Sequence, residues 1–236
     1  MITIVSFSIC PFVQRVTALL EAKGLDYRVS YISLSDPPPW FSALSPTGQV
    51  PLLVTEAGEA LFESDAIVEY LDEIAPPLIA SLSPVQRAQD RAWSTQASKH
   101  YLPQCSAMQS ADRAVLAERE APLHAAFDRA EAAIGDGPYF RGDALGNVDI
   151  AWLPLLHRAA RVEAHSGHDL LHGHPKVKAW QHSLADTGLF AAWVSADFNA
   201  DFDGFYLSER TYLGRGADPT EACAPRPAQP TSGCCG

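Results

Sequence analysis

The sequence predicts a mixed α/β unit over residues 1–75, followed by an all-helical unit over residues 84–207. In the first unit, short apolar runs and helical patterns follow each other in the order β-α-β and then β-β-α. This order is typical of a mixed sheet with helices packed on it. Farther along the chain, long helical patterns rich in Ala, Leu, Arg and Glu replace the strands. We expect residues 75–83 to link the two units.

Each element of the first unit has its own local signal. The glycine-containing turn at residues 56–59 predicts a hairpin between two short apolar runs. Gly24 ends the first helical pattern, and Ser64 is the expected N-cap of the second. The proline run at residues 36–39 cannot form regular structure on its own. The expected strands are residues 2–6, 27–32, 50–54 and 60–63, and the expected helices are residues 11–23 and 64–74.

The helical unit is predicted to bury large aromatic side chains, among them those of Trp93, Phe127 and Trp152. Gly146 stands at the expected N-cap of one helix, where glycine is only slightly worse than serine. Asp149, three residues on, is placed to accept a hydrogen bond from the cap backbone. The expected helices are residues 84–109, 112–134, 147–162 and 175–185, with a short one near 188–194.

Composition excludes several classes of function. The formal net charge of −11 argues against nucleic-acid binding, which depends largely on clustered lysine and arginine. No apolar run approaches the length that crosses a membrane, and no basic segment with an apolar stretch opens the chain as in a signal peptide. Five cysteines, three of them in the last fourteen residues, make no disulfide framework. We therefore expect a reducing, cytoplasmic location.

Residues 8–12, Ser-Ile-Cys-Pro-Phe, hold the main candidate for chemistry. Cys10 lies where the first strand passes into the first helix, and Pro11 suits the first helical position. A helix N-terminus stabilises an anion, so we expect a reactive Cys10 thiolate with a lowered pKa. The alternative is a small buried cysteine that only fills the core. Because Val13 occupies the position that a redox dithiol would need, the reaction would use one thiol.

A set of short motifs then resembles the cytosolic glutathione transferases, above all the omega class and its cysteine-type bacterial relatives. The motifs that carry this resemblance are Cys10-Pro11-Phe12, Gln14-Arg15, Lys23-Gly24, Trp40-Phe41, residues 45–51, Glu63-Ser64-Asp65-Ala66-Ile67, residues 70–73, Phe140-Arg141-Gly142-Asp143 and Asp149-Ile150-Ala151-Trp152. The resemblance implies a thioredoxin-like N-terminal domain and a helical C-terminal domain. It also implies glutathione as co-substrate between the domains, no permanently bound cofactor, and a homodimer.

The resemblance also assigns a glutathione site. Val50 would precede a cis Pro51 and pair its backbone with the cysteinyl part of glutathione. Ser64, at a helix N-terminus, would hold the γ-glutamyl carboxylate, and Glu63 would accept from the γ-glutamyl ammonium. Phe12 and Leu34 complete the site.

Four positions at or near this site depart from the family pattern or have another explanation. Pro37 stands where omega-class members often have a lysine for the glycyl end of glutathione. Ser64 and Glu63 also fit a plain helix cap beside a surface carboxylate, and Pro51 fits the start of a strand. These alternatives stay open on the sequence.

A second substrate would lie over Cys10 against the helical unit. The candidates for lining it are His100, Tyr101, Cys105, Met108, Trp180 and Trp193, although for any single one a core position is favoured. The histidines between positions 165 and 174 match no zinc signature, so we expect no metal site there. Residues 208–236 are predicted to be disordered, and their adjacent Cys234 and Cys235 are either incidental, metal ligands or a redox pair.

The predicted function is glutathione-dependent thiol–disulfide exchange through Cys10, on glutathionyl mixed disulfides or dehydroascorbate-like oxidants. An alternative within the same family is conjugation of glutathione to a small electrophile. An alternative of another class is a binding protein that keeps the glutathione-transferase fold without catalysis.

Overall fold

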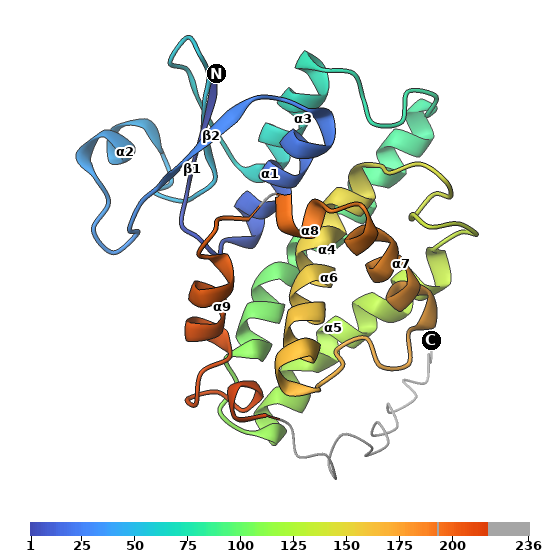
Figure 1. The fold of residues 1–236 in the computed structure, drawn as a ribbon. Helices are drawn as coiled ribbons and strands as arrows, with labels where there is room; N and C mark the ends of the chain where they lie inside the picture. Colours follow the sequence, from blue (N-terminus) through green and yellow to red (C-terminus); the bar gives the residue numbers. More distant parts are fainter. Residues whose placement is uncertain (193, 217–236) are drawn as a thin grey trace, which may run out of the picture.

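The computed structural model describes residues 1–192 and 194–216. Trp193 and residues 217–236, with Cys223, Cys234 and Cys235, lie outside the described residues, so the predictions for them stay predictions. The elements of the first third are β1 (Ile2–Ser6), α1 (Pro11–Lys23), β2 (Tyr27–Tyr31), α2 (Pro39–Leu44), β3 (Leu52–Val54), β4 (Ala60–Phe62) and α3 (Ser64–Ile74) (Figure 1).

These strands form one mixed sheet in the order β2-β1-β3-β4. The β1 strand runs parallel to β2, because helix α1 crosses over between them, and antiparallel to β3. The β3 and β4 strands form the predicted hairpin. Helices α1 and α3 cover one side of the sheet, and α2 lies on the other (Figure 1). The sheet buries Ile4, Val5, Leu52 and Leu53 completely.

The rest of the described chain is helical, as predicted. Its central helix is α6 (Asn147–Ser166), which packs against α4 and α7 and also against α1 of the first unit. Because α6 has partners on several sides, Trp152 and Leu155 are fully buried. The other helices are α4 (Pro84–Met108), α5 (Arg113–Ala133), α7 (Pro175–Asp186), α8 (Leu189–Ala192) and α9 (Phe198–Tyr206), followed by the 3₁₀ turn η1 (Leu213–Arg215).

The structure corrects three predictions about elements. Helix α2 begins inside the proline run, because Pro39 occupies the first helical position, where no N–H is needed. The N-cap of α3 is Glu63, and Ser64 is the first helical residue. Helix α9 was not predicted, although Phe198 and Phe202 lie four residues apart and are both buried.

The expectation of disorder is wrong for residues 208–216. Leu213 is 1% exposed, and the Tyr212 N–H donates to the Ser110 carbonyl at 2.8 Å. A single large apolar residue in a Gly-rich segment is enough to dock it when the α4–α5 junction offers a partner for its backbone.

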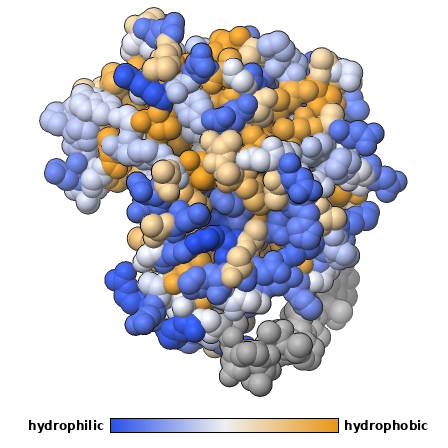
Figure 2. All heavy atoms as spheres, in the orientation of Figure 1, coloured by the Kyte–Doolittle hydropathy of each residue, from blue (hydrophilic) through white to orange (hydrophobic). Residues whose placement is uncertain are grey.

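The hydropathy of the surface shown in Figure 2 differs between the two units. Hydrophobic residues gather in the upper part of this face, around the sheet, α1 and α3, whereas the helical part below is largely hydrophilic. Within residues 1–192 and 194–216, no helix is both long and apolar enough to span a membrane.

Candidate active site

Cys10 lies at the junction of β1 and α1, as predicted. Its backbone is extended (φ −75°, ψ 119°), which makes it the N-cap of α1, and Pro11 is the first helical residue. The Cys10 carbonyl accepts the first helical hydrogen bond, from the Gln14 N–H at 3.0 Å. The Cys10 sulfur makes no capping hydrogen bond to the first turn. This helix N-terminus therefore carries a thiol in the place of the usual capping oxygen.

Burial decides the protonation of Cys10. The residue is 3% exposed, and desolvation raises the pKa of its thiol to about 11. The backbone N–H groups of Val13 and Phe12 and the Arg158 guanidinium act in the opposite direction, but their effect is smaller. The expectation of a lowered Cys10 pKa is thus wrong, because the helix N-terminus does not outweigh the loss of water. At neutral pH Cys10 is a thiol.

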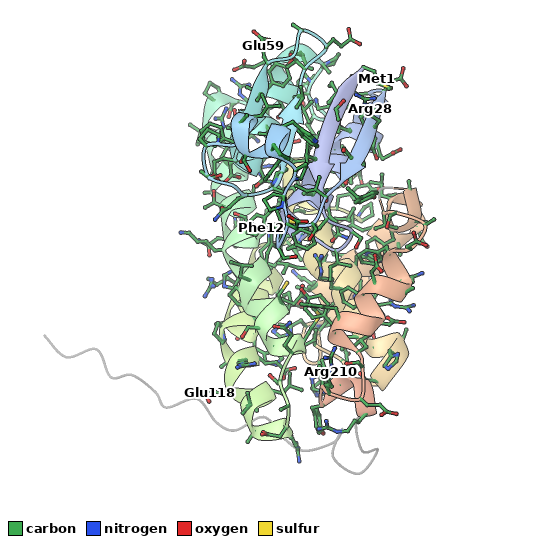
Figure 3. All side chains as sticks on the ribbon, turned by 90° about the vertical axis from the view of Figure 1, so that its left-hand side faces the viewer. Met1, Phe12, Arg28, Glu59, Glu118 and Arg210 are labelled. Atoms are coloured by element: carbon green, nitrogen blue, oxygen red, sulfur yellow. The ribbon has the colours of Figure 1, made fainter. Side chains whose placement is uncertain are left out.

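Phe12 connects the start of α1 to the helical unit. Its half-buried ring meets the Tyr101 ring of α4 edge to face, with the centroids 5.1 Å apart. Figure 3 places Phe12 between the sheet and the helical part of the molecule. Cys10 therefore lies at the boundary between the two units, where a ligand can contact both.

The peptide bond between Val50 and Pro51 is cis, as predicted. Val50 is 8% exposed and lies two residues before the start of β3. None of the hydrogen bonds found among the described residues uses the backbone N–H or C=O of Val50. These two groups are available to an extended peptide-like ligand that pairs with the chain as an added strand.

Glu63 and Ser64 form an open helix N-terminus. Among residues 1–192 and 194–216, Glu63 is the only non-glycine residue with a positive φ, 67°. Such a backbone costs about 1–3 kcal/mol and is found mainly at functional sites. Ser64 is 6% exposed, and no side chain caps α3. An ion pair between Arg15 of α1 and Asp65 ties the start of α3 to α1.

A pocket of about 340 Å³ opens beside the loop that carries Cys10. Leu34, which is 42% exposed, follows this pocket along the chain but does not line it. The Asp-Pro-Pro-Pro run that contains Pro37 offers no cation there. The pocket is lined by Phe7, Ser8, Tyr31, Ile32, Ser33, Ser195, Asp197 and Asp201.

The residues predicted to line a second-substrate site on α4 differ in their burial and in their partners. Cys105 is half-buried and interacts with Tyr206 of α9, and Tyr101 contacts Phe12, so α4 does face α1. Tyr101 is fully buried, and its hydroxyl donates to the Ala151 carbonyl. His100 is engaged with its own helix, since its Nδ1 lies 2.6 Å from the Gln96 carbonyl oxygen.

Trp180 belongs to the core of the helical unit and not to a substrate surface. It is 2% exposed, and its ring packs against those of Phe140 and Trp152. Its N–H donates to the Asp149 carboxylate at 2.7 Å. This correction follows from tertiary packing, because a sequence gives no direction for a buried indole.

Arg158 of α6 is a residue that the sequence reasoning missed. It is 1% exposed, and its Nη2 donates to the carbonyl of Ile9, the neighbour of Cys10, at 2.8 Å. The available signal was a cation within an otherwise apolar helical run. Since Ile9 is 149 positions away in the sequence, the contact itself had no local signature.

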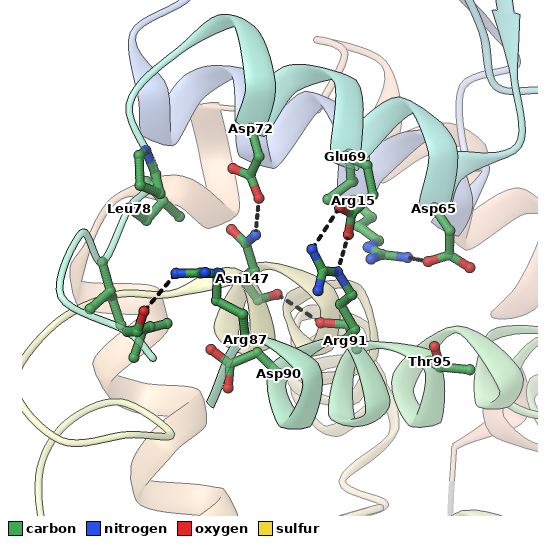
Figure 4. A pocket seen from close by; sticks show the side chains of 15 residues that line it. Arg15, Asp65, Glu69, Asp72, Leu78, Arg87, Asp90, Arg91, Thr95 and Asn147 are labelled. Atoms are coloured by element: carbon green, nitrogen blue, oxygen red, sulfur yellow. Dashed lines mark hydrogen bonds and ion pairs between the residues drawn. The ribbon is translucent and has the colours of Figure 1, made fainter. Parts of the chain in front are cut away.

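A second pocket, of about 230 Å³, lies between α3 and α4 (Figure 4). Its charged side chains largely neutralise each other. Arg91 makes two hydrogen bonds to the Glu69 carboxylate, and Asn147 donates to Asp72. These contacts join the sheet unit to the helical unit, so this pocket serves the packing of the two.

The histidine-rich segment forms individual contacts. His168 Nε2 lies 2.6 Å from a Glu120 carboxylate oxygen, and His174 Nε2 lies 2.9 Å from an Asp128 carboxylate oxygen. These pairs attach the segment to α5. Within the described part of the chain, no cluster of three or more His, Cys, Asp or Glu side chains is arranged to hold a metal ion.

Comparison with known proteins identifies this arrangement. Residues 9–74 match the model of the glutathione S-transferase N-terminal domain, and residues 113–180 match that of the glutathione S-transferase C-terminal domain. Together the two matches span more than half of the chain.

Curated relatives extend this likeness over most of the chain. Glutathione S-transferase omega-1 of Sus scrofa is 28% identical, over 88% of this chain and 86% of the relative. Pyrimidodiazepine synthase of Drosophila melanogaster is 30% identical, over 84% of this chain and 82% of the relative. Glutathione S-transferase DHAR2 of Arabidopsis thaliana is 31% identical, over 67% of this chain and 70% of the relative.

Solved structures share the fold. Glutathione transferase Omega 3C from Trametes versicolor superimposes with a TM-score of 0.73 at 22% identity, over 87% of this chain and 90% of that one. At this identity the likeness shows the shared fold, with its thioredoxin-like N-terminal domain and helical C-terminal domain. The chain therefore belongs to the glutathione S-transferase family and is an enzyme of that superfamily, with omega-class proteins among its relatives.

Proposed function

We propose that this enzyme catalyses glutathione-dependent thiol–disulfide exchange through Cys10. The main support is the position of Cys10 at the N-terminus of α1, next to Ile9, whose carbonyl accepts from Arg158 of the helical unit. The relatives whose names include omega-1 and DHAR2 are consistent with a thiol-based reaction in this branch of the family.

Glutathione would bind along the edge of the sheet unit. The free backbone N–H and C=O of Val50 would pair with its cysteinyl part, next to the cis Pro51. The open N-terminus of α3 at Ser64 would hold the γ-glutamyl carboxylate, and Glu63 would accept from the ammonium group. Phe12 and Leu34 would flank the tripeptide. Pro37 offers no positive charge for the glycyl carboxylate, so we expect modest affinity.

The reaction would proceed in two exchanges. The Cys10 thiol first loses its proton to water, and the thiolate then attacks the glutathione sulfur of a glutathionyl disulfide. The S–S bond breaks, and the other sulfur leaves as a thiolate that takes up a proton. The thiolate of a second glutathione then attacks the Cys10–glutathione disulfide. This step releases glutathione disulfide and returns Cys10 to a thiol. No internal resolving thiol is needed, and Cys234 and Cys235 take no part in this scheme.

A specific observation also favours a second candidate, the conjugation of glutathione to a small electrophile. Because burial raises the pKa of Cys10 to about 11, its protonated thiol can donate a hydrogen bond to the thiolate of bound glutathione. The nucleophile would then be glutathione itself. Measurable turnover in either reaction would exclude the third possibility, a binding protein without catalysis.

Paired assays separate these functions. Thioltransferase activity and aryl-halide conjugation are measured on wild type, Cys10→Ser and the control Cys105→Ser, with glutathione binding followed by calorimetry. We expect Cys10→Ser to lose disulfide reduction by about 10³-fold or more, since the nucleophile is gone, yet to bind glutathione. Cys105→Ser should keep the reaction. Retained reduction in Cys10→Ser contradicts the proposal, and retained conjugation alone supports the second candidate.

We further propose that the enzyme is a homodimer. The large apolar side chains of Phe62 and Val85 are 39% and 67% exposed, which a partner subunit would cover. Light scattering on the purified protein measures its mass directly. About twice the chain mass of 25.5 kDa is expected, and a monomer at all concentrations contradicts the proposal.

A further inference from the structure

Arg158 is a buried charge without a counter-charge. Its guanidinium is 1% exposed, and of its three nitrogens only Nη2 has a hydrogen-bond acceptor, the Ile9 carbonyl at 2.8 Å. Nε and Nη1 are buried and have no partner among the described residues. In the same part of the chain, no carboxylate lies within ion-pair distance of it.

Such an arrangement is unfavourable for folding. Taking a charge out of water costs several kcal/mol unless an opposite charge and hydrogen bonds replace the water. The Phe202 ring is a weak substitute, because its centroid lies 6.0 Å from the guanidinium carbon, at the limit of a cation–π contact. A protein that keeps such a group needs it for a state in which an anion is present.

The groups around Arg158 narrow the identity of that anion. Arg158 interacts electrostatically with Tyr101 of α4, Tyr206 of α9 and Cys10 at the start of α1. Burial raises the pKa of Tyr101 and Tyr206 above the ordinary range of tyrosine, so both stay neutral. The charges of Arg15 and Asp65, which also act on Tyr101, form an ion pair with each other.

We infer that Arg158 is the counter-cation of the Cys10 thiolate and a positioning residue for its reaction, an inference that rests on the function proposed above. The Nη2 bond to Ile9 fixes the residue that precedes Cys10. The N–H groups of the two unpaired nitrogens, Nε and Nη1, stay available for the sulfur anion that forms when Cys10 ionises. Cys10 therefore reacts as part of an ion pair across the α1–α6 interface.

The test follows Cys10 alone and needs no glutathione. Iodoacetamide alkylation of the Cys10 peptide is measured by mass spectrometry from pH 6.5 to 10 in wild type, Arg158→Met and Arg158→Lys. Without the charge, we expect the pKa of Cys10 to rise by about one unit, so that alkylation at pH 8 slows about tenfold in Arg158→Met. Arg158→Lys keeps the charge and should stay within about threefold of wild type.

Arg161→Gln is the matched control, because Arg161 lies one turn farther along α6 and its charge is already paired with Asp203. We expect its alkylation profile to match wild type. An unchanged profile in folded Arg158→Met overturns the inference. So does a loss equal in Arg158→Lys and Arg158→Met, which would indicate a shape effect.

Stability separates this role from a structural one. Replacing an uncompensated buried charge by an apolar side chain of similar size is often neutral or stabilising, so the thermal midpoint of Arg158→Met should equal or exceed that of wild type. Failure of Arg158→Met to fold overturns the inference. If wild type shows no disulfide turnover, the proposed function fails, and the alkylation series still decides the role of Arg158.

Discussion

Two buried helix N-termini in this molecule are completed in opposite ways. At α6, Gly146 is the N-cap and the Asp149 carboxylate, 1% exposed, accepts three hydrogen bonds. The donors are the N–H groups of Gly146 at 2.7 Å, Phe140 at 2.8 Å and the Trp180 ring at 2.7 Å. At α1, the Cys10 sulfur makes no capping hydrogen bond, although the Val13 and Phe12 N–H groups lower its pKa. The Arg158 guanidinium, which donates to the carbonyl of the neighbouring Ile9, has two unpaired nitrogens.

The difference separates a structural site from a functional one. Buried polar groups in native proteins are normally hydrogen-bonded, and the Asp149 carboxylate at the α6 terminus follows this rule. The α1 terminus departs from it, and we propose that its remaining partners arrive with the substrate. The free energy of unfolding should therefore depend strongly on Asp149 and weakly on Arg158. The reactivity of Cys10 should depend strongly on Arg158 and weakly on Asp149.

The largest effect is expected for Asp149→Ala. It leaves three buried N–H donors without an acceptor, at about 1–3 kcal/mol for each, partly relieved by water. We expect the free energy of unfolding to fall by about 3–5 kcal/mol, measured by urea denaturation. A loss below about 1 kcal/mol would mean that this terminus is not the structural member of the pair.

The pH dependence of Cys10 is the next largest effect. Because burial raises the pKa of its thiol to about 11, the thiolate fraction should grow about tenfold for each pH unit between 7 and 10. Peptide-resolved alkylation should rise in the same way and show no plateau near pH 8. If the alkylation rate instead reaches a plateau near or below the ordinary pKa of cysteine, the raised pKa is contradicted and the lowered pKa expected from the helix N-terminus is supported.

The raised pKa of Cys10 also makes the stability of the folded protein depend on pH. A thiol whose pKa is raised in the folded state favours folding while it is protonated. This contribution is fully present below the pKa of the unfolded chain, and it is lost as the pH rises through about 9 to 11. Over that pH interval, the free energy of unfolding of wild type should therefore fall relative to that of Cys10→Ser.

Glu63→Gly should give the smallest effect. Glycine adopts the positive φ of 67° without strain, so we expect the free energy of unfolding to rise by about 1 kcal/mol. Glutathione affinity should fall, since the acceptor for the ammonium group is lost. Glu63→Ala is the control that keeps the strain, and equal stability of the two variants would show that the backbone at this position is relaxed.

Local signals in the sequence predicted much of the fold. The bounds of β1 and α1, the β3–β4 hairpin and the Gly146–Asp149 cap depend on residues close together in the chain, and the structure has them as expected. Helix α2 was missed because the prolines before it read as a break, although Pro39 can start a helix.

The site was harder to predict where it depends on distant contacts. The position of Cys10 follows from a local pattern, but its pKa depends on how deeply α4, α6 and α9 bury it. Arg158 meets the Cys10 loop only through the packing of α6 on α1, and Trp180 turns toward Asp149 for a similar reason. Burial and charge at the site are properties of the assembled fold.

In the proposed reaction, Cys10 at the N-terminus of α1 is the residue that exchanges with glutathione. The most direct measurement is mass spectrometry of non-reduced digests after incubation with glutathione disulfide, on wild type and Cys10→Ser. We expect one glutathionyl group on the Cys10 peptide of wild type and none at the corresponding peptide of the variant. A glutathionyl group found on Cys105 or the C-terminal cysteines, with the Cys10 peptide unmodified during turnover, would contradict the account.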